Sequence, residues 1–342
     1  MAVEAQPASA RTAAGGERDP RYPPSPFPIG WFQVGFADQL KAGEVSPFRA
    51  MGRDFVLWRG EDGEPHLMDA HCAHLGAHIG HGGVVVGNCI RCPFHAWEYG
   101  ADGRCVKVPY GSGRIHPDAG VATHPLVERN GMLLMWWHPR GEAPAWEIPE
   151  LPEYGDPGWT DYEPHEWHID THWQEMVENA VDTSHFHYLH GTEVVPTIPE
   201  YSFEGHVLHV KADHVFRTPM GPRQGFIDTH MHGPGWGTVR IEITDLVQIL
   251  FPQALTPVDV GHLHATFSFM TRGRGARSML GRALSQEIIA QIDADAPIWE
   301  AKLYRPLPRL ADGDGPVLPF RRWAEQFYVE DGAAAAAANG AG

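Results

Sequence analysis

The sequence is poor in cysteine, contains no long apolar run and has too few basic residues to balance its acidic ones. Four cysteines in 342 residues exclude a secreted scaffold that several disulfides hold together. The absence of about 18 consecutive apolar residues predicts a chain without an integral membrane segment. A formal net charge of −17, from 26 Lys and Arg against 43 Asp and Glu, argues against nucleic acid as the main partner, because phosphate is bound by an excess of cations.

What the sequence does contain is enough apolar material for two folded domains. It is 43% hydrophobic, and a single core rarely grows beyond about 250–300 residues. A passage rich in Pro, Glu and Gly, residues 142–158, is typical of a connection. We therefore expect a first domain at 26–150 and a second at 151–330, between a flexible arm at 1–25 and a disordered tail at 331–342. The arm lacks the apolar centre of a secretory signal, which predicts a cytoplasmic protein.

The apolar pattern predicts an α+β fold. Between residues 55 and 137, short apolar runs alternate with Gly, Asp and Pro, which is typical of a small all-β domain. The second domain is predicted to be an antiparallel sheet with helices at both of its sequence ends. Its predicted helices span 171–189, 284–304 and 319–328, and its predicted strands span 202–215, 239–251 and 262–271.

Two Cys/His pairs, separated by 17 residues, form the first candidate metal site. They are Cys72-x-His74 and Cys92-x-x-His95. Two loops that each present one thiolate and one imidazole can bind a tetrahedral zinc ion or a Rieske [2Fe-2S] cluster, in which one iron takes both cysteines and the other takes both histidines. Zinc fingers usually group their cysteines as one pair and their histidines as another. The mixed pairs therefore favour the cluster.

A competing interpretation of this region is a C-x-x-C pair formed by Cys89 and Cys92. Such a pair can be a redox dithiol or half of a zinc site. It would leave Cys72 and His74 without a purpose, so we expect Cys89 and Cys105 to be buried free thiols.

A second candidate metal site lies in the predicted helix 171–189. Glu178, Asp182 and His185 are spaced four and three apart, which would place them on one helix face. His190 follows five residues later, and two imidazoles with one carboxylate would make the facial triad of oxygen-activating Fe(II). His187 would stand roughly 200° around the helix from His185, so we interpret it as structural.

The third ligand is expected from the long helix near the C-terminus. Its apolar stripe passes Ile292 and Trp299, and Asp295 fills the position between them. A carboxylate on a buried stripe is costly unless a partner such as a metal compensates its charge. Asp293 lies off the stripe and is expected to be solvated. Pro297 is expected to kink the helix.

At this point the residues resemble a known family. The segments CAHLGAH (72–78) and GGVVVGNCIRCPFHAWEY (82–99) resemble the Rieske domain of the Rieske non-haem iron oxygenases, although Ala96 stands where that family usually has glycine. The pattern Asn179-x-x-Asp182-x-x-His185-x4-His190 resembles the ferrous-iron motif of the same family, and Asp295 falls where these enzymes have their last iron ligand. The C-terminal residues and the loop sequences are most similar to the 3-ketosteroid 9α-hydroxylase and cholesterol 7-desaturase branch.

The resemblance implies a helix-grip catalytic domain and an oxygenase component. Its cofactors would be the [2Fe-2S] cluster and a mononuclear Fe(II), with O2 as co-substrate and a bulky apolar, steroid-like molecule as the substrate that is hydroxylated or desaturated. No G-x-G-x-x-G motif follows a predicted strand, so NAD(P)H is expected to act only through a separate reductase, directly or through a ferredoxin.

The resemblance also implies a homotrimer and a role for Asp182. By that resemblance Asp182 is not a metal ligand. It would hydrogen-bond an iron-bound histidine and bridge to a cluster histidine, His95, of a neighbouring subunit.

Three alternatives stay open on the sequence alone. The substrate can be an aromatic compound or an alkaloid instead of a steroid. Without an assembled second site, the chain would be an electron carrier only. With zinc in both sites, it would be a structural or binding protein.

Overall fold

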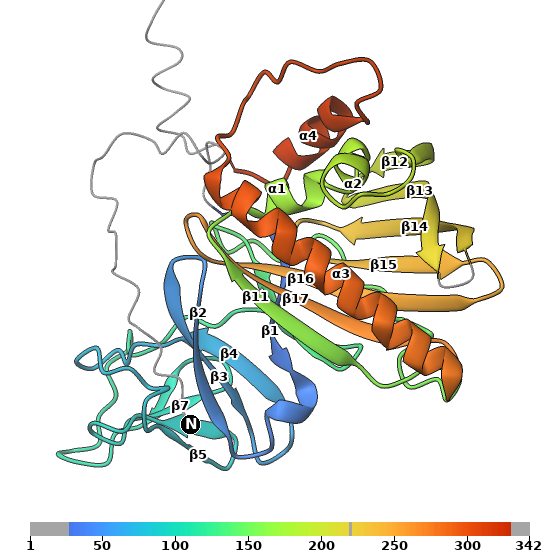
Figure 1. Ribbon diagram of the computed structural model, residues 1–342. Helices are drawn as coiled ribbons and strands as arrows, with labels where there is room; N and C mark the ends of the chain where they lie inside the picture. Colours follow the sequence, from blue (N-terminus) through green and yellow to red (C-terminus); the bar gives the residue numbers. More distant parts are fainter. Residues whose placement is uncertain (1–26, 219–220, 330–342) are drawn as a thin grey trace, which may run out of the picture.

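The computed structural model describes residues 27–218 and 221–329. The predicted arm 1–25 and the predicted tail 331–342 lie outside these residues. The described chain has an N-terminal part made of small antiparallel sheets and a C-terminal part built on one large sheet (Figure 1). The predicted α+β fold is confirmed. Among the described residues, no helix combines the length and the apolar character needed to cross a membrane.

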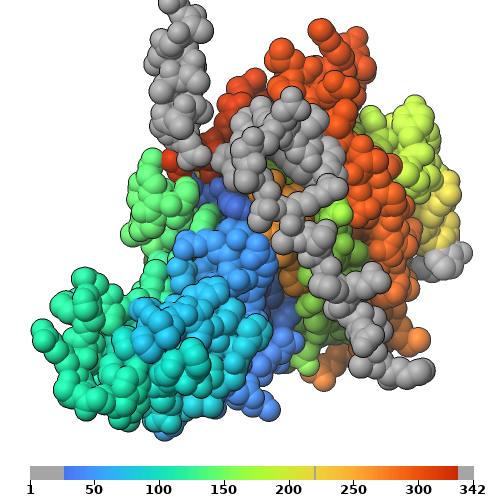
Figure 2. All heavy atoms as spheres, turned by 90° about the vertical axis from the view of Figure 1, so that its left-hand side faces the viewer, coloured from blue at the N-terminus to red at the C-terminus, as the bar shows by residue number. Residues whose placement is uncertain are grey.

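The N-terminal part consists of three sheets and one short 3-10 turn, η1 (Ala37–Gln39). The sheets follow the strand orders β1-β10-β9, β2-β3-β4 and β5-β6-β7-β8. Their strands are β1 (Gly30–Phe36), β2 (Val45–Ala50), β3 (Arg53–Arg59), β4 (Pro65–Asp69), β5 (Val84–Val86), β6 (Cys89–Arg91), β7 (Glu98–Gly100), β8 (Cys105–Lys107), β9 (Leu126–Arg129) and β10 (Met132–Trp137). In the space-filling view this part forms a lobe of its own, coloured blue to green (Figure 2).

Strand β10 joins the two parts because it is buried on both faces. Successive side chains of a strand point to opposite sides. Leu133 and Met135 therefore enter the core of the N-terminal part, whereas Leu134 and Trp136 pack in a second cluster that includes Trp236 of the C-terminal part. The continuous apolar run that suggested a strand thus serves two cores.

The C-terminal part is one antiparallel sheet of seven strands, in the order β11-β17-β16-β15-β14-β13-β12. From β12 to β17, strands that are neighbours in the sheet are also consecutive in the chain and form hairpins. Strand β11 lies at one edge of the sheet, beside β17. The strands are β11 (Glu163–Ile169), β12 (Thr197–Glu204), β13 (Val207–Thr218), β14 (Gly221–His232), β15 (Trp236–Ile243), β16 (Val247–Asp259) and β17 (His262–Thr271).

Two segments that the sequence predicts as single strands each contain parts of two strands. The predicted strand 202–215 contains the turn between β12 and β13, and 239–251 contains the turn between β15 and β16. Gly205 takes a φ of 54° and Asp245 a φ of 59°, which permits tight turns. Both arms of a hairpin bury the same face, so the alternation of apolar residues continued across each turn and hid it.

In the part of the chain that the structure describes, four helices accompany the sheet, namely α1 (Trp173–Glu178), α2 (Ser184–Tyr188), α3 (Ala276–Ala301) and α4 (Val317–Glu325). Figure 1 shows α3 crossing one face of the sheet, while α1, α2 and α4 gather near the β12 end. Helix α3 continues past Pro297 to Ala301.

The prediction of one continuous helix at 171–189 is wrong, because the chain turns between α1 and α2. Val181 in this turn is fully buried, and a Cβ atom on Gly315 would lie only 1.7 Å from its carbonyl oxygen, so the two segments pack backbone to backbone. The Asp182 carboxylate then accepts a hydrogen bond from the Ser184 N–H (3.2 Å) and begins a new helix.

Candidate metal centres and the cavity beside them

The two predicted cluster loops adopt the same backbone pattern. The Cys72 N–H donates to the Ala77 carbonyl (2.9 Å), and the Cys92 N–H donates to the Trp97 carbonyl (2.8 Å). Each cysteine carbonyl accepts from the N–H four residues later, at Gly76 and at Ala96. These two residues have positive φ angles of 74° and 56°, so Ala96 takes the left-handed conformation that glycine adopts more easily.

The loops bring the four predicted cluster residues together, with the cysteines inside and the histidines nearer the surface. Cys72 and Cys92 are 4% and 2% exposed, and their thiols interact with each other. The His74 and His95 rings lie 4.7 Å apart between centroids. Nδ1 of His74 is buried without a hydrogen-bond partner in the described chain, as a free ligand atom would be. Cys89 is half-buried on β6 and Cys105 is buried on β8.

Tyr99 contacts this site, a role that no residue pattern in the sequence indicates beyond its place close to the second loop. Its hydroxyl accepts a hydrogen bond from the Ala73 N–H (3.1 Å) and lies 3.0 Å from the Cys72 sulfur. Burial and Cys72 raise the pKa of Tyr99, so the hydroxyl stays protonated and can donate to a deprotonated Cys72 sulfur. Beside it, Trp97 stacks on the His74 ring (4.6 Å) and donates to the Tyr110 hydroxyl (2.9 Å).

The second centre assembles from three elements: His185 on α2, His190 just after it and Asp295 on α3. Their potential ligand atoms lie within 4.8 Å of one another. Nε2 of His190 is 3.3 Å from Oδ1 of Asp295, and the two imidazole rings are nearly perpendicular at 83°. Asp295 is only 4% exposed, so its charge requires a partner.

The tautomer of His185 suits metal binding. Its Nδ1 lies 2.5 Å from the Asp182 backbone carbonyl and therefore carries the proton, which leaves Nε2 unprotonated, with a lone pair that can bind a metal. Burial lowers the pKa of His185, so the ring is neutral. The Asp182 carboxylate, which was expected to make this hydrogen bond, is 3.9 Å from Nδ1 and accepts the Ser184 N–H instead.

Asn179 connects the ligands, although the sequence assigned it no role beyond its place in the motif. Its amide donates to Oδ2 of Asp295 (3.2 Å) and lies 3.5 Å from Nε2 of His185. The Trp299 indole N–H donates to Oδ1 of the Asn179 amide (3.4 Å). Asn179 thereby holds Oδ2 of Asp295, while Oδ1 of the same carboxylate faces His190.

Three sequence interpretations around this centre need correction or comment. Glu178 does not share a face with His185, because the turn after α1 directs it to Arg321 (2.6 and 2.9 Å). His187 lies outside the group, as expected, with Nδ1 2.6 Å from the Thr192 carbonyl. Asp293 is exposed but also accepts a hydrogen bond from the Trp167 indole (2.9 Å), so it is not merely solvated.

A further group of potential ligands, His209, Asp228 and His230, fits a metal poorly. It lies on β13 and β14, on the side of the sheet away from α3. The two imidazole rings are stacked nearly parallel (13°) with centroids 4.2 Å apart, so their in-plane lone pairs do not converge. Asp228 is already hydrogen-bonded to His209 (2.8 Å).

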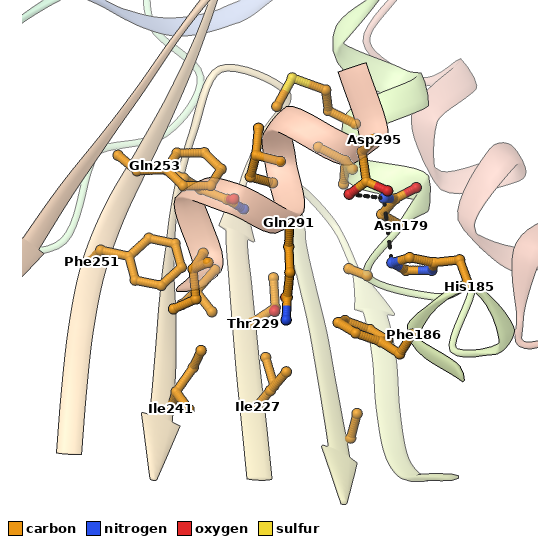
Figure 3. Close-up of a pocket in the computed structure, with 18 of the residues that line it drawn as sticks. Asn179, His185, Phe186, Ile227, Thr229, Ile241, Phe251, Gln253, Gln291 and Asp295 are labelled. Atoms are coloured by element: carbon orange, nitrogen blue, oxygen red, sulfur yellow. Dashed lines mark hydrogen bonds between the residues drawn. The ribbon is translucent and has the colours of Figure 1, made fainter. Parts of the chain in front are cut away.

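An apolar cavity of about 860 Å³, open mouth included, adjoins His185, His190 and Asp295. It lies between α3 and the sheet (Figure 3). Most of its wall is apolar, with polar side chains at Asn179, Thr229, Gln253 and Gln291. Among the described residues that line it there is no Lys or Arg. The apolar wall includes Phe186, Ile227, Ile241, Phe251, Phe267 and Ile292.

The two centres do not lie together within one chain. In Figure 1, β5 and β7, which flank the loop sites, lie at the opposite end of the molecule from α2.

Family models match nearly the whole described chain. The model of the Rieske [2Fe-2S] domain matches residues 30–125. The model of the 3-ketosteroid 9α-hydroxylase C-terminal domain matches residues 135–328.

Curated relatives match over the same length. A cholesterol 7-desaturase of Ciona intestinalis is 31% identical, over 90% of this chain and 70% of the relative. A probable 3-ketosteroid-9-alpha-monooxygenase oxygenase component of Rhodococcus rhodochrous is 32% identical, over 90% of this chain and 82% of the relative. Among solved structures, dicamba monooxygenase bound to dicamba has a TM-score of 0.73 at 19% identity, over 87% of this chain and 96% of that one. That likeness carries the fold alone.

Proposed function

Because the chain belongs to the Rieske non-haem iron oxygenases, in the branch of the 3-ketosteroid 9α-hydroxylases and cholesterol 7-desaturases, we propose that His185, His190 and Asp295 hold its catalytic iron. The protein is an oxygenase component, its cofactors are a Rieske cluster and a mononuclear iron, and O2 is its co-substrate. When bound, the cluster supplies electrons one at a time and the iron supplies open coordination positions for dioxygen.

The proposed iron ligands rest on one observation: two imidazoles and a buried carboxylate converge beside an apolar cavity. Asn179 fixes Asp295, and the Asp182 carbonyl fixes the tautomer of His185. The apolar wall excludes water from the substrate. For the cluster, we assign Cys72 and Cys92 to one iron and His74 and His95 to the other, on the strength of the paired loops.

Electrons come from a separate reductase, as the naming of relatives as oxygenase components implies. We propose that this reductase is NAD(P)H-dependent, acting directly or through a ferredoxin. We propose further that the chain forms a head-to-tail homotrimer in which Asp182 faces the neighbouring subunit's His95. Support comes from the opposite placement of the two centres in Figure 1, and from the Asp182 side chain, which is 43% exposed.

The proposed substrate is a steroid-like molecule that is hydroxylated or desaturated. The cavity suits a bulky apolar body, because most of its wall is made of aliphatic and aromatic side chains from α3 and the sheet. The relatives named above act on ketosteroids and cholesterol by their printed names.

The substitution His185→Ala tests the iron site. It should abolish turnover and remove the mononuclear iron, so that iron analysis falls from three to two per chain, while the Rieske electron paramagnetic signal persists. His187→Ala, two residues away and outside the group, is the matched control and should keep three irons and turnover. An active His185→Ala protein with three irons would contradict the assignment, whereas wild-type protein with only two irons would favour an electron carrier.

A further inference from the structure

Two polar side chains without hydrogen-bond partners line the apolar cavity. Thr229 lies on β14 and is 5% exposed, and Gln291 lies on the cavity side of α3. Neither side chain makes a hydrogen bond to any other residue that the structure describes. Two other polar side chains of the wall do make hydrogen bonds, since Asn179 donates to Asp295 and the NH2 group of Gln253 donates to the Met231 sulfur (2.7 Å).

The position of Gln291 relates it directly to the proposed iron ligand. It precedes Asp295 by four residues, which is about one turn or about 6 Å along a helix, so both side chains project from the same face. Figure 3 shows the Gln291 side chain extending from α3 toward β14, the strand on which Thr229 and Ile227 lie. The cavity wall is therefore polar at the proposed iron ligands, at Gln253 on β16 and where Gln291 reaches toward the sheet.

An apolar molecule that fills the cavity would cover both groups, and a hydroxyl or amide covered without a partner costs free energy, so a polar atom of the bound molecule is the partner expected here. A glutamine amide and a threonine hydroxyl can each donate and accept, and both are uncharged. With no Lys or Arg among the described lining residues, a carboxylate held beside Gln291 and Thr229 would have no cationic side chain to compensate its charge. The chemistry of the wall selects a neutral molecule with an oxygen atom.

We propose that Gln291 and Thr229 bind a carbonyl or hydroxyl oxygen of a neutral substrate, and that this contact sets which carbon atom lies beside the iron ligands. The inference rests on the proposed steroid oxygenase function. The apolar body supplies affinity through contact with the wall. The oxygen fixes its orientation and its depth, because leaving Gln291 and Thr229 unpaired is costly.

Binding of matched steroids tests the proposal on the holoprotein without turnover. Equilibrium dialysis compares 5α-androstan-3-one with 5α-androstane, which lacks the oxygen. The variants Gln291→Leu and Thr229→Val should each weaken binding of the ketone about three- to tenfold, the worth of one hydrogen bond, and leave binding of the hydrocarbon within about twofold. Thr229→Ser, which keeps the hydroxyl, should retain ketone affinity.

Ile227→Val is the matched control, because it shortens an apolar side chain of the same wall and should weaken both ligands by a similar factor. Iron content and the cluster spectrum verify that each variant is folded. An equal loss for ketone and hydrocarbon in Gln291→Leu and Thr229→Val would overturn the proposal. So would wild-type protein that binds 5α-androstane-3-carboxylate as well as it binds the ketone.

The result also separates this inference from the function on which it rests. If wild-type protein binds neither the ketone nor the hydrocarbon, the steroid function fails and the inference fails with it. If wild-type protein binds both and the variants do not discriminate between them, only the inference about Gln291 and Thr229 fails.

Discussion

At the scale of single residues, Tyr99 shows how a side chain outside the ligand set adjusts a redox centre. Its hydroxyl accepts a hydrogen bond from the Ala73 N–H, and among the described residues the Cys72 sulfur is the one acceptor within reach of its proton. A hydrogen bond to a cluster sulfur stabilises the more negative, reduced state and so raises the reduction potential. The burial that keeps Tyr99 protonated keeps this donor in place.

We expect Tyr99→Phe to lower the reduction potential of the cluster by about 40 mV, which corresponds to about 1 kcal/mol for one electron. Protein-film voltammetry measures the shift. Tyr110→Phe is the control, since Tyr110 bonds Trp97 and is expected to leave the potential unchanged. An unchanged potential in Tyr99→Phe would show that its proton does not reach the sulfur.

Residue types and their spacing predicted much of the two sites. The alternation of Cys and His in the loops 72–74 and 92–95, and a carboxylate on an apolar stripe at Asp295, are local signals. The role of Asn179 was not predictable in the same way, because its partner Asp295 is 116 residues away. Ala96 is an intermediate case: its departure from glycine was visible, and its φ of 56° explains why glycine is easier there.

At the scale of elements, a buried ion network joins α1 to α4 just before the iron motif. Arg321 on α4 holds Glu178 on α1 with two hydrogen bonds, and Lys302 contacts Glu175 (2.5 Å) and Glu178 (3.6 Å). The Arg321 and Glu178 side chains are about one-tenth exposed. The network fixes the end of α1, and Asn179 is the next residue.

Removal of one partner should leave an uncompensated charge in this network. We expect Arg321→Met to lower the free energy of unfolding by about 3 kcal/mol, because Glu178 then stays buried with only Lys302 nearby. The double variant Glu178→Leu/Arg321→Met should be less destabilised than the single one, since no unpaired carboxylate remains. Urea denaturation followed by tryptophan fluorescence compares them, and a double variant less stable than Arg321→Met would contradict this account.

Element boundaries were the least predictable feature of the fold. The residues 171–189 have a helical pattern throughout, yet contact between Val181 and Gly315 forces a turn between α1 and α2. This contact joins segments far apart in the sequence, so no local pattern contains it. The hairpin turns between β12 and β13 and between β15 and β16 were not predicted for a different reason, because the alternation of apolar and polar residues continues through them.

At the scale of the whole molecule, the separation of the two centres makes assembly a functional question. The cluster loops and α2 lie at opposite ends of the folded molecule in Figure 1. A head-to-tail ring would place the loop end of one subunit next to the iron end of another.

Mixed assemblies test this arrangement. His185→Ala should lack the iron but keep the cluster, and His95→Ala should lack the cluster but keep the iron, so each alone is inactive. Co-expressed in equal amounts, they should recover about a quarter of wild-type turnover, because half of the subunits supply each centre and a random ring joins a working pair at one contact in four. Mixtures that stay inactive although mass spectrometry detects mixed trimers would contradict transfer between subunits.

The sequence by itself determined the chemistry, because Cys, His and Asp in a local spacing limit which metals can be held. It also determined the fold class, because apolar periodicity reflects which faces are buried. Only the tertiary structure decided where the helix at 171–189 breaks, what Asn179 and Tyr99 contact, and that Gln291 and Thr229 share one cavity. Those facts arise from contacts between residues far apart in the chain, which the packing of α3 and the sheet creates and no local pattern encodes.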